Sequence, residues 1–219
     1  MRMKKILAFG DSNTWGFVPG GFDPITVRAS RYPREHRWAG VMANLLGAEY
    51  EVIEEGLNGR TAVLDDPFLP FLVNGKTYLL PCLLSHSPLD LVAIMLGTNE
   101  LKSRFNLNAS EIARGIRQLI WLIKSLNIGT NNKVPEILIM APSVANENVG
   151  DFKSDFVGST AKSKEFAKYY SEICKIENCH FLDANLYSEY SNIDGIHYDK
   201  ENQIKLGQAM FKVVKQILG

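Results

Sequence analysis

Five short runs of apolar residues narrow the folds open to this sequence more than any other feature. The runs are residues 6–9, 50–53, 91–96, 137–141 and 180–182. Within each run the apolar residues follow one another instead of alternating with polar ones, which is typical of strands that are covered on both faces. A sheet built from such strands is expected to be parallel and to lie between helices.

Helical patterns lie between these runs and after the last one. Apolar stripes with helical spacing occupy residues 38–46, 112–123, 166–173 and 210–218, and the first stripe stops at Gly47. The alternation predicts an α/β fold, a three-layer α/β/α sandwich around a flavodoxin-like, doubly wound, parallel five-stranded sheet. The 219 residues contain no repeat and no low-complexity linker, so we expect one domain over residues 1–219.

Charge and cysteine content limit the partners. The 24 basic and 24 acidic residues balance, which argues against nucleic acid or an anionic membrane and favours a small neutral molecule. Three cysteines without CxxC spacing indicate reduced thiols in a cytoplasmic protein. The apolar stretch near the N-terminus is too short for a signal peptide, and no run is long enough to span a bilayer.

Polar, glycine-bearing segments follow the predicted strands. They are "GDSN", "EGLNGRT", "GTNE" and "DANLYSEYSNIDGIHYD". Ligands of doubly wound sheets bind beyond the carboxyl ends of the strands, so these segments are expected to meet at one edge. Two further segments, residues 61–75 and 142–158, follow the same ends and are expected to rim a binding cleft.

Ser12 lies where a strand turns into a helix, and a serine there is either a nucleophile or an anion ligand. A nucleophilic serine needs a histidine base and an acid that orients it. In "DGIH", Gly195 permits a sharp turn that lets the Asp194 carboxylate reach Nδ1 of His197, which leaves Nε2 free for Ser12. The alternative is an ordinary Asp-Gly turn with a surface histidine.

Acyl transfer also requires donors for the oxyanion. Three are expected at the strand edge: the backbone N–H groups of Ser12 and Gly59 and the side-chain amide of Asn99. Taken singly, Gly59 can equally be a turn residue and Asn99 a helix cap.

The set Gly10-Asp11-Ser12, Gly59, Gly97-Thr98-Asn99 and Asp194-Gly195-Ile196-His197 resembles the four sequence blocks of the SGNH (GDSL) hydrolase family, in the right order along the whole chain. "FGDSNTWGF", "DDPF" and "DGIHYDKEN" are most similar to the bacterial arylesterase and acyltransferase (perhydrolase) branch. The first and last blocks are specific, and the middle two are weak by themselves.

This resemblance implies a serine esterase of small acyl or aryl esters, with acyl transfer to alcohols or hydrogen peroxide as a side activity. Ser12 would be the nucleophile, His197 the base and Asp194 the orienting acid, with Ser12, Gly59 and Asn99 as the oxyanion hole. It also implies a homo-oligomer in which residues 142–158 pack against a neighbouring subunit. No metal or cofactor is expected, because acyl transfer needs none and the sequence shows no HExxH or Cys/His cluster.

Two positions depart from the family pattern. Glu100 follows Asn99 where the family usually has aspartate, and we expect this acid to tie down the loop. Gly59 stands where near relatives carry another small residue, which keeps the N–H donor.

Residues that flank these blocks are assigned to the substrate pocket. They are Asp11, Trp15, Phe17, Asn58, Thr98 and Ile196. Arg60 is expected to form a surface ion pair with Asp65 or Glu55, or else to steer an anionic group.

Two other substrates fit the same fold and chemistry, namely acetylated sugars and lysophospholipids. A different class of function, a flavodoxin-like module that binds phosphate or flavin at the Ser12 turn, is also open. The sequence lacks GxxxxGK[ST] and GxGxxG, and phosphate binding does not require the Asp194/His197 pair.

Overall fold

The central feature of the computed structural model, which describes residues 2–23 and 25–219, is a parallel sheet. Within those residues its five strands lie in the order β4-β1-β5-β6-β7. The strands are β1 (Lys4–Gly10), β4 (Tyr50–Gly56), β5 (Leu91–Met95), β6 (Glu136–Ala141) and β7 (His180–Asp183). In chain order this is the 2-1-3-4-5 arrangement of flavodoxin-like sheets, and it confirms the predicted fold class.

The register brings the carboxyl ends of the central strands to one level. Gly10 at the end of β1 pairs with Gly56 of β4 on one side and with Met95 of β5 on the other. Every residue of β5 and the last five of β1 are buried, as the continuous apolar runs predicted. The segments that follow Gly10, Gly56 and Met95 therefore leave the sheet side by side.

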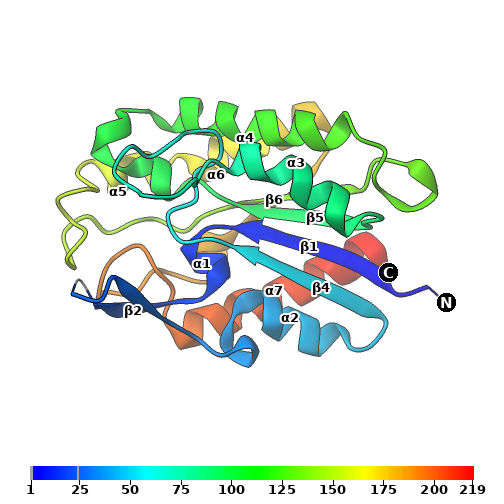
Figure 1. Ribbon diagram of the computed structural model, residues 1–219, viewed down its shortest axis with the longest axis horizontal. Coiled ribbons are helices and arrows are strands. Elements are labelled where there is room, and N and C mark those ends of the chain that lie inside the picture. The colour runs from blue at the N-terminus through cyan, green and yellow to red at the C-terminus, as the bar shows by residue number, and fades with distance from the viewer. Residues whose placement is uncertain (1, 24) are drawn as a thin grey trace.

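Helices cover both faces of the sheet (Figure 1). Helices α3, α4 and α6 lie on one face, and α2 and α7 pack together on the other. The helices are α1 (Ser12–Trp15), α2 (Trp38–Leu46), α3 (Gly75–His86), α4 (Ala109–Lys124), α5 (Ser159–Ser163), α6 (Phe166–Glu177) and α7 (Lys200–Leu218). Short 3-10 turns span Arg34–His36, Asn99–Leu101, Ser103–Phe105, Thr130–Asn132 and Ala184–Leu186.

The helix ends have local causes in the sequence. Helix α2 stops at Gly47, whose φ of 74° is a conformation that glycine adopts at little cost. Helix α4 begins with a capping box between Asn108 and Glu111. Asp199 caps α7 by accepting a hydrogen bond from the Asn202 amide over 2.9 Å.

Four elements were not predicted. Helix α3 carries Pro81 and is apolar around much of its circumference, so it lacks the amphipathic period of the others. An antiparallel pair, β2 (Phe17–Asp23) and β3 (Arg28–Arg31), follows the first turn, and its glycine- and proline-rich, largely exposed residues carry no strand alternation. The five-residue helix α5 is too short to show a period.

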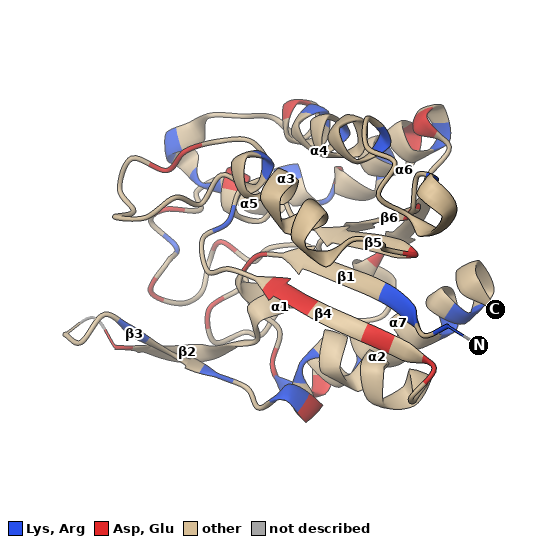
Figure 2. Cartoon of the chain, turned by 45° about the vertical axis from the view of Figure 1, so that its right-hand side comes forward, with Lys and Arg blue, Asp and Glu red and all other residues tan. Residues whose placement is uncertain are grey.

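The surface carries charges of both signs spread over helices and loops, as Figure 2 shows. In the part of the chain that the structure describes, no helix has both the length and the apolar character needed to cross a bilayer.

Candidate active site

The turn after β1 places a serine at the edge of the sheet. Asp11 caps the short helix α1, and its Oδ1 accepts a hydrogen bond from the Asn13 amide over 2.9 Å. Ser12 is the first helical residue and is 6% exposed. A Cβ on Gly10 would lie 2.1 Å from Oγ1 of Thr14, so the tight turn requires glycine at that position.

Ser12, His197 and Asp194 form a hydrogen-bonded chain. Oγ of Ser12 lies 2.8 Å from Nε2 of His197, and Nδ1 of His197 lies 2.8 Å from Oδ2 of Asp194. All three residues are buried. This geometry places the imidazole to accept a proton from the serine, and the carboxylate to fix the imidazole's tautomer and stabilise an imidazolium.

The loop that carries Asp194 and His197 is held by hydrogen bonds and close contacts. The second Asp194 oxygen, Oδ1, accepts the backbone N–H groups of Ile196 over 3.2 Å and His197 over 3.0 Å. Gly195 has a φ of 76°, and a Cβ there would lie 2.1 Å from the carbonyl oxygen of Asn146. The Asp194-Gly195 pair therefore forms a closed turn, and this turn places the Asp194 carboxylate beside the His197 imidazole.

Asn13, which sequence reasoning missed, joins this loop to the serine turn. Its Nδ2 donates to the Ile196 carbonyl over 3.0 Å, and its Oδ1 accepts the Tyr198 amide over 3.1 Å. Gln203 joins the same turn to α7 by donating to the Asn13 carbonyl over 2.9 Å. The signal for Asn13 was its position directly after Ser12, whereas nothing in the sequence marked Gln203.

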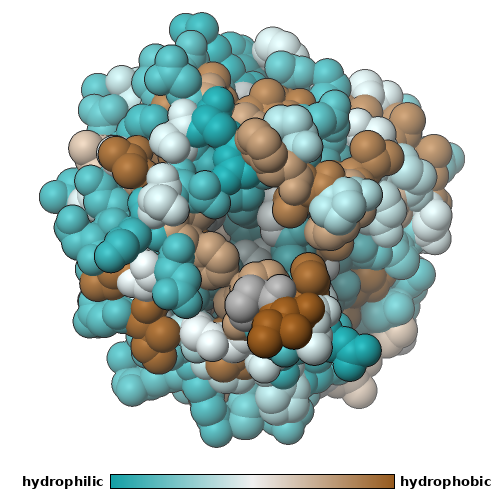
Figure 3. All heavy atoms as spheres, turned by 60° about the vertical axis from the view of Figure 1, so that its left-hand side comes forward, coloured by the Kyte–Doolittle hydropathy of each residue, from teal (hydrophilic) through white to brown (hydrophobic). Residues whose placement is uncertain are grey.

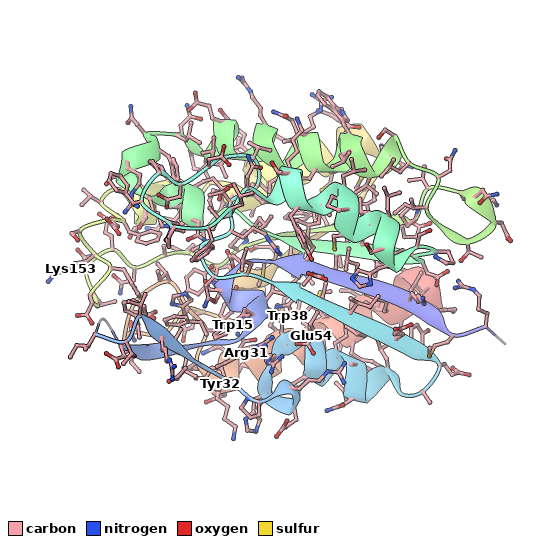
Figure 4. The ribbon with its side chains drawn as sticks, in the orientation of Figure 1. Trp15, Arg31, Tyr32, Trp38, Glu54 and Lys153 are labelled. Atoms are coloured by element: carbon pink, nitrogen blue, oxygen red, sulfur yellow. The ribbon has the colours of Figure 1, made fainter. Side chains whose placement is uncertain are left out.

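Two aromatic rings pack around the imidazole. The Phe17 ring stacks on His197 with centroids 4.1 Å apart and planes inclined by 19°. Phe152 contacts the same imidazole edge-on, with ring centroids 6.2 Å apart. The Phe152 ring also lies edge-on to the Phe17 ring, with centroids 6.5 Å apart. Phe152 belongs to segment 142–158, so this segment does reach the Ser12–His197 pair. Lys153, its neighbour, points outward from the tip of the segment in Figure 4.

The expected oxyanion donors lie on the turns after β1, β4 and β5. Among the described residues, neither the Ser12 nor the Gly59 amide donates a backbone hydrogen bond. Gly59 has a φ of 79°, and a Cβ there would lie 2.7 Å from Cδ1 of Leu69. Asn99 is 7% exposed and uses one amide hydrogen on the Arg60 carbonyl over 3.1 Å, which leaves its second hydrogen for a ligand.

The expectation of a surface ion pair for Arg60 is wrong. The residue is 3% exposed, and its guanidinium lies 4.2 Å from the ring centroid of Phe9 and 5.2 Å from that of Tyr78. It donates to the carbonyl oxygens of Gly10, over 2.9 Å, and Glu55. Arg60 therefore ties the serine turn to the end of β4, through aromatic contacts that sequence alone does not reveal.

Two further buried carboxyl groups, those of Asp11 and Glu100, lie next to Ser12 and Asn99 in the sequence. Burial raises the pKa of Asp11 to about 6, although the Asn13 amide and the charge of His197 act in the opposite direction. Burial raises the pKa of Glu100 to about 7. Glu100 accepts the Ala62 amide through Oε1, so it does tie down a loop, as expected, and the loop that it holds is the one that follows Gly59.

The remaining residues assigned to the pocket have varied surroundings. Trp15 is half-buried beneath the Arg31 guanidinium, which lies 4.8 Å from its ring centroid, and the two residues are labelled side by side in Figure 4. Thr98 exchanges a hydrogen bond with the Tyr190 hydroxyl over 2.9 Å. Ile196 is 6% exposed, and Oδ1 of Asn58 is buried without a hydrogen-bond partner among the described residues.

The face formed by these turns is hollowed at its centre, with hydrophilic and hydrophobic atoms around the hollow (Figure 3). Segment 61–75, the second expected rim, encloses a separate cavity of about 220 Å³, which is lined by its residues 65–66 and 69–73 and by none of Ser12, Asp194 and His197. The arrangement offers a serine, a base, an acid and amide donors at one edge of the sheet. This is the set that acyl transfer requires.

Comparisons with known proteins agree with this chemistry. Residues 8–203 match the model of the GDSL-like Lipase/Acylhydrolase family. The native aryl esterase of M. smegmatis is 39% identical, with a TM-score of 0.90 over 98% of this chain and 100% of that one. Est24, a carbohydrate acetylesterase from Sinorhizobium meliloti, is 40% identical, with a TM-score of 0.89 over 98% and 100%.

A carbohydrate acetylesterase family member from the same organism is 34% identical, with a TM-score of 0.91 over 99% of this chain and 100% of that one. A search of the curated proteins found no match.

Proposed function

Because this chain belongs to the GDSL-like lipase/acylhydrolase family and is a serine ester hydrolase, we propose that Ser12, His197 and Asp194 carry out its reaction on small acyl and aryl esters. The observation that carries the proposal is the chain of two 2.8 Å hydrogen bonds from the Ser12 hydroxyl through His197 to Asp194. The alternative of a phosphate- or flavin-binding module is wrong, since the family match is to acylhydrolases.

The reaction proceeds in two halves. Nε2 of His197 takes the proton of Ser12 as its Oγ attacks the ester carbonyl, and Asp194 stabilises the imidazolium that forms. The amides of Ser12 and Gly59 and the free Asn99 hydrogen donate to the oxyanion. His197 then protonates the departing alcohol, which leaves an acyl group on Ser12. In the second half a water, activated by the same imidazole, releases the acid.

Labelling with a fluorophosphonate tests the assignment of the nucleophile. We expect one adduct per chain, on Ser12, and its loss in Ser12→Ala and His197→Ala. His180→Ala is the matched control, because His180 also pairs with a carboxylate, Glu136, over 2.9 Å but lies at the surface. Labelling of Ser12→Ala at the parent rate would refute the assignment.

A second substrate class, acetylated sugars, has a specific observation in its favour: two of the similar structures carry the name carbohydrate acetylesterase. No comparable observation favours lysophospholipids. A series of p-nitrophenyl esters of increasing chain length, run beside a peracetylated sugar, separates these substrates. A steep fall in kcat/KM beyond short acyl groups supports a small-acyl pocket, and faster turnover on adding an alcohol supports acyl transfer.

We also propose that the chain is a single cytoplasmic domain that forms a homo-oligomer. Large apolar side chains stand exposed on the turn between β2 and β3, within segment 61–75 and just before α5, among them Ile25, Val27, Phe68, Leu72 and Val157. All three cysteines are unpaired thiols, as a reducing compartment favours. Sedimentation of the purified protein tests the assembly, and a monomer at all concentrations would refute it.

A further inference from the structure

A second group of reactive side chains lies between β4 and α3. Glu55, Cys82 and His86 each offer one ligand atom, and these three atoms lie within 4.8 Å of one another. Nε2 of His86 is already 3.1 Å from Oε1 of Glu55, which is a normal spacing for two atoms that bind one ion. The group shares no residue with the Ser12–His197–Asp194 chain.

The fold brings these residues together in a simple way. Cys82 and His86 are one helical turn apart on α3, so both project from the same side of that helix. Side chains alternate along β4: Glu54 faces Arg34 and Arg37, and Glu55 faces α3. The carboxyl end of β4, which holds both acids, is coloured red in Figure 2.

The surroundings also favour an ion at this place. The Tyr78 hydroxyl donates to the other Glu55 oxygen, Oε2, over 3.2 Å, and so orients the carboxylate from outside the group. Glu55, Tyr78 and Arg60 line a cavity of about 470 Å³, so an ion bound to Glu55 has a route of entry. Cys82 itself is 2% exposed and packs beneath the helix.

A thiolate, an imidazole and a carboxylate are together the donor set that Zn²⁺ prefers, and three protein ligands leave a fourth position for water. We propose that Glu55, Cys82 and His86 bind Zn²⁺. The ion replaces the thiol proton of Cys82, which passes to solvent, and His86 binds through its neutral imidazole. Zinc at this position joins α3 to the end of β4, immediately before the turn that carries Gly59.

The charges of Glu55 and Arg60 have opposite effects on the Cys82 thiol. Burial, followed by the charge of Glu55, raises the pKa of the Cys82 thiol to about 12, while Arg60 lowers it. Once the thiol is ionised, the carboxylate and the thiolate carry two negative charges and the fixed Arg60 guanidinium one positive charge. A divalent cation is thus met by a net charge of −1, so we expect affinity weaker than that of an all-thiolate site.

Zinc titration of the purified full chain tests the proposal. The protein is first stripped with a chelator, and Ser12 is blocked with a sulfonyl fluoride so that His197 does not take up metal. We expect one equivalent of Zn²⁺ to bind, with release of one proton and a rise in Tm. Cobalt(II) in place of zinc should give a thiolate-to-metal charge-transfer band.

The chain supplies matched controls for each ligand. Cys82→Ser and His86→Ala should weaken binding by about 100-fold or more, because loss of even an outer-shell partner costs 10- to 100-fold. Cys174→Ser and His180→Ala should leave it unchanged. Circular dichroism checks that the variants fold, and if Cys82→Ser does not, the more exposed His86→Ala provides the result.

Two outcomes would overturn the proposal. The first is no saturable zinc binding by the stripped, Ser12-blocked chain that carries no substitution. The second is binding that survives His86→Ala with its charge-transfer band intact. In the first case His86 is only a hydrogen-bond partner of the Glu55 carboxylate, and in the second case the metal is bound by other ligands. Neither outcome bears on ester hydrolysis, which is measured separately.

Discussion

Phe17 forms one wall of the space around His197, with the two rings nearly parallel and their centroids 4.1 Å apart. The phenyl ring excludes water from one face of the imidazole and limits its rotation. Phe17 was assigned to the substrate pocket from sequence, and this contact adds a positioning role. The Ser12–His197 hydrogen bond should therefore depend on the aromatic ring.

Phe17→Leu keeps the bulk and removes the stacking. We predict a fall in kcat of about 3- to 10-fold, since aromatic pairs contribute about 0.5–1.5 kcal/mol beyond buried area. KM for a short p-nitrophenyl ester should change less than kcat. Phe22→Leu, on the same strand but 41% exposed, is the control. Equal kcat values in the two variants would rule out the positioning role.

Asn13→Ala removes both side-chain hydrogen bonds between the serine turn and the His197 loop. The Ile196 carbonyl and the Tyr198 amide would then be buried without partners, so we predict a loss of about 2–4 kcal/mol in the free energy of unfolding. The variant should also react more slowly with a fluorophosphonate at Ser12. Urea denaturation measures the loss, with Asn192→Ala, exposed in the same loop, as the control. A loss no larger than that of the control would contradict the prediction.

Asn99→Ala tests the side-chain donor of the proposed oxyanion hole. Removing such a donor costs about 3 kcal/mol of transition-state stabilisation, so kcat should fall by about 100-fold or more with little change in KM. Steady-state kinetics with p-nitrophenyl acetate provides the measurement, and Asn44→Ala on the exposed side of α2 is the control. Normal turnover of Asn99→Ala would remove this residue from the site.

Glu100 should make stability fall as the pH rises. Its pKa moves from 4.5 to about 7 on folding, so the folded chain binds the proton more tightly than the unfolded one. The stabilisation is full below pH 4.5 and is lost through pH 7, a change of about 3 kcal/mol.

Glu100→Gln cannot ionise at this position. Its free energy of unfolding, relative to that of the parent, should therefore rise by about 3 kcal/mol between pH 4.5 and 8. Urea denaturation across this range provides the test. Glu172→Gln, on the exposed side of α6, should keep the parent's pH dependence. The hypothesis fails if the parent and Glu100→Gln show the same slope.

The sheet was readable from sequence because its central strands β1, β5 and β6 are largely buried and show as continuous apolar runs. The edge strands β4 and β7 are only partly buried, and shorter apolar stretches mark them. Helix α3 was not readable, since Pro81 and the apolar residues on several sides obscure its period. For the same reason the meeting of Cys82 and His86 could not be foreseen. A spacing of four residues has meaning only once the segment is known to be a helix.

The site was readable where chemistry and geometry coincide in a short segment. Ser12 and the Asp194–His197 pair stand in motifs whose glycines permit tight turns. The structure brings these residues together, and their catalytic roles are still a prediction. Phe152 lies in a long loop and Gln203 in α7, and both reach the site only through the tertiary fold, so their contacts could not be predicted from sequence. Arg60 was misread because charged residues are expected at the surface, and the sequence does not show the Phe9 and Tyr78 rings that enclose its guanidinium.

The Ser12–His197 hydrogen bond joins residues 185 positions apart in the chain. During synthesis on the ribosome Ser12 emerges 185 residues before His197, so the two side chains meet only after all the segments between them have been made. By the proposed roles of these residues, the hydroxyl stays unactivated until the turn after β1 and the loop that holds His197 come together, and the appearance of esterase activity reports that event.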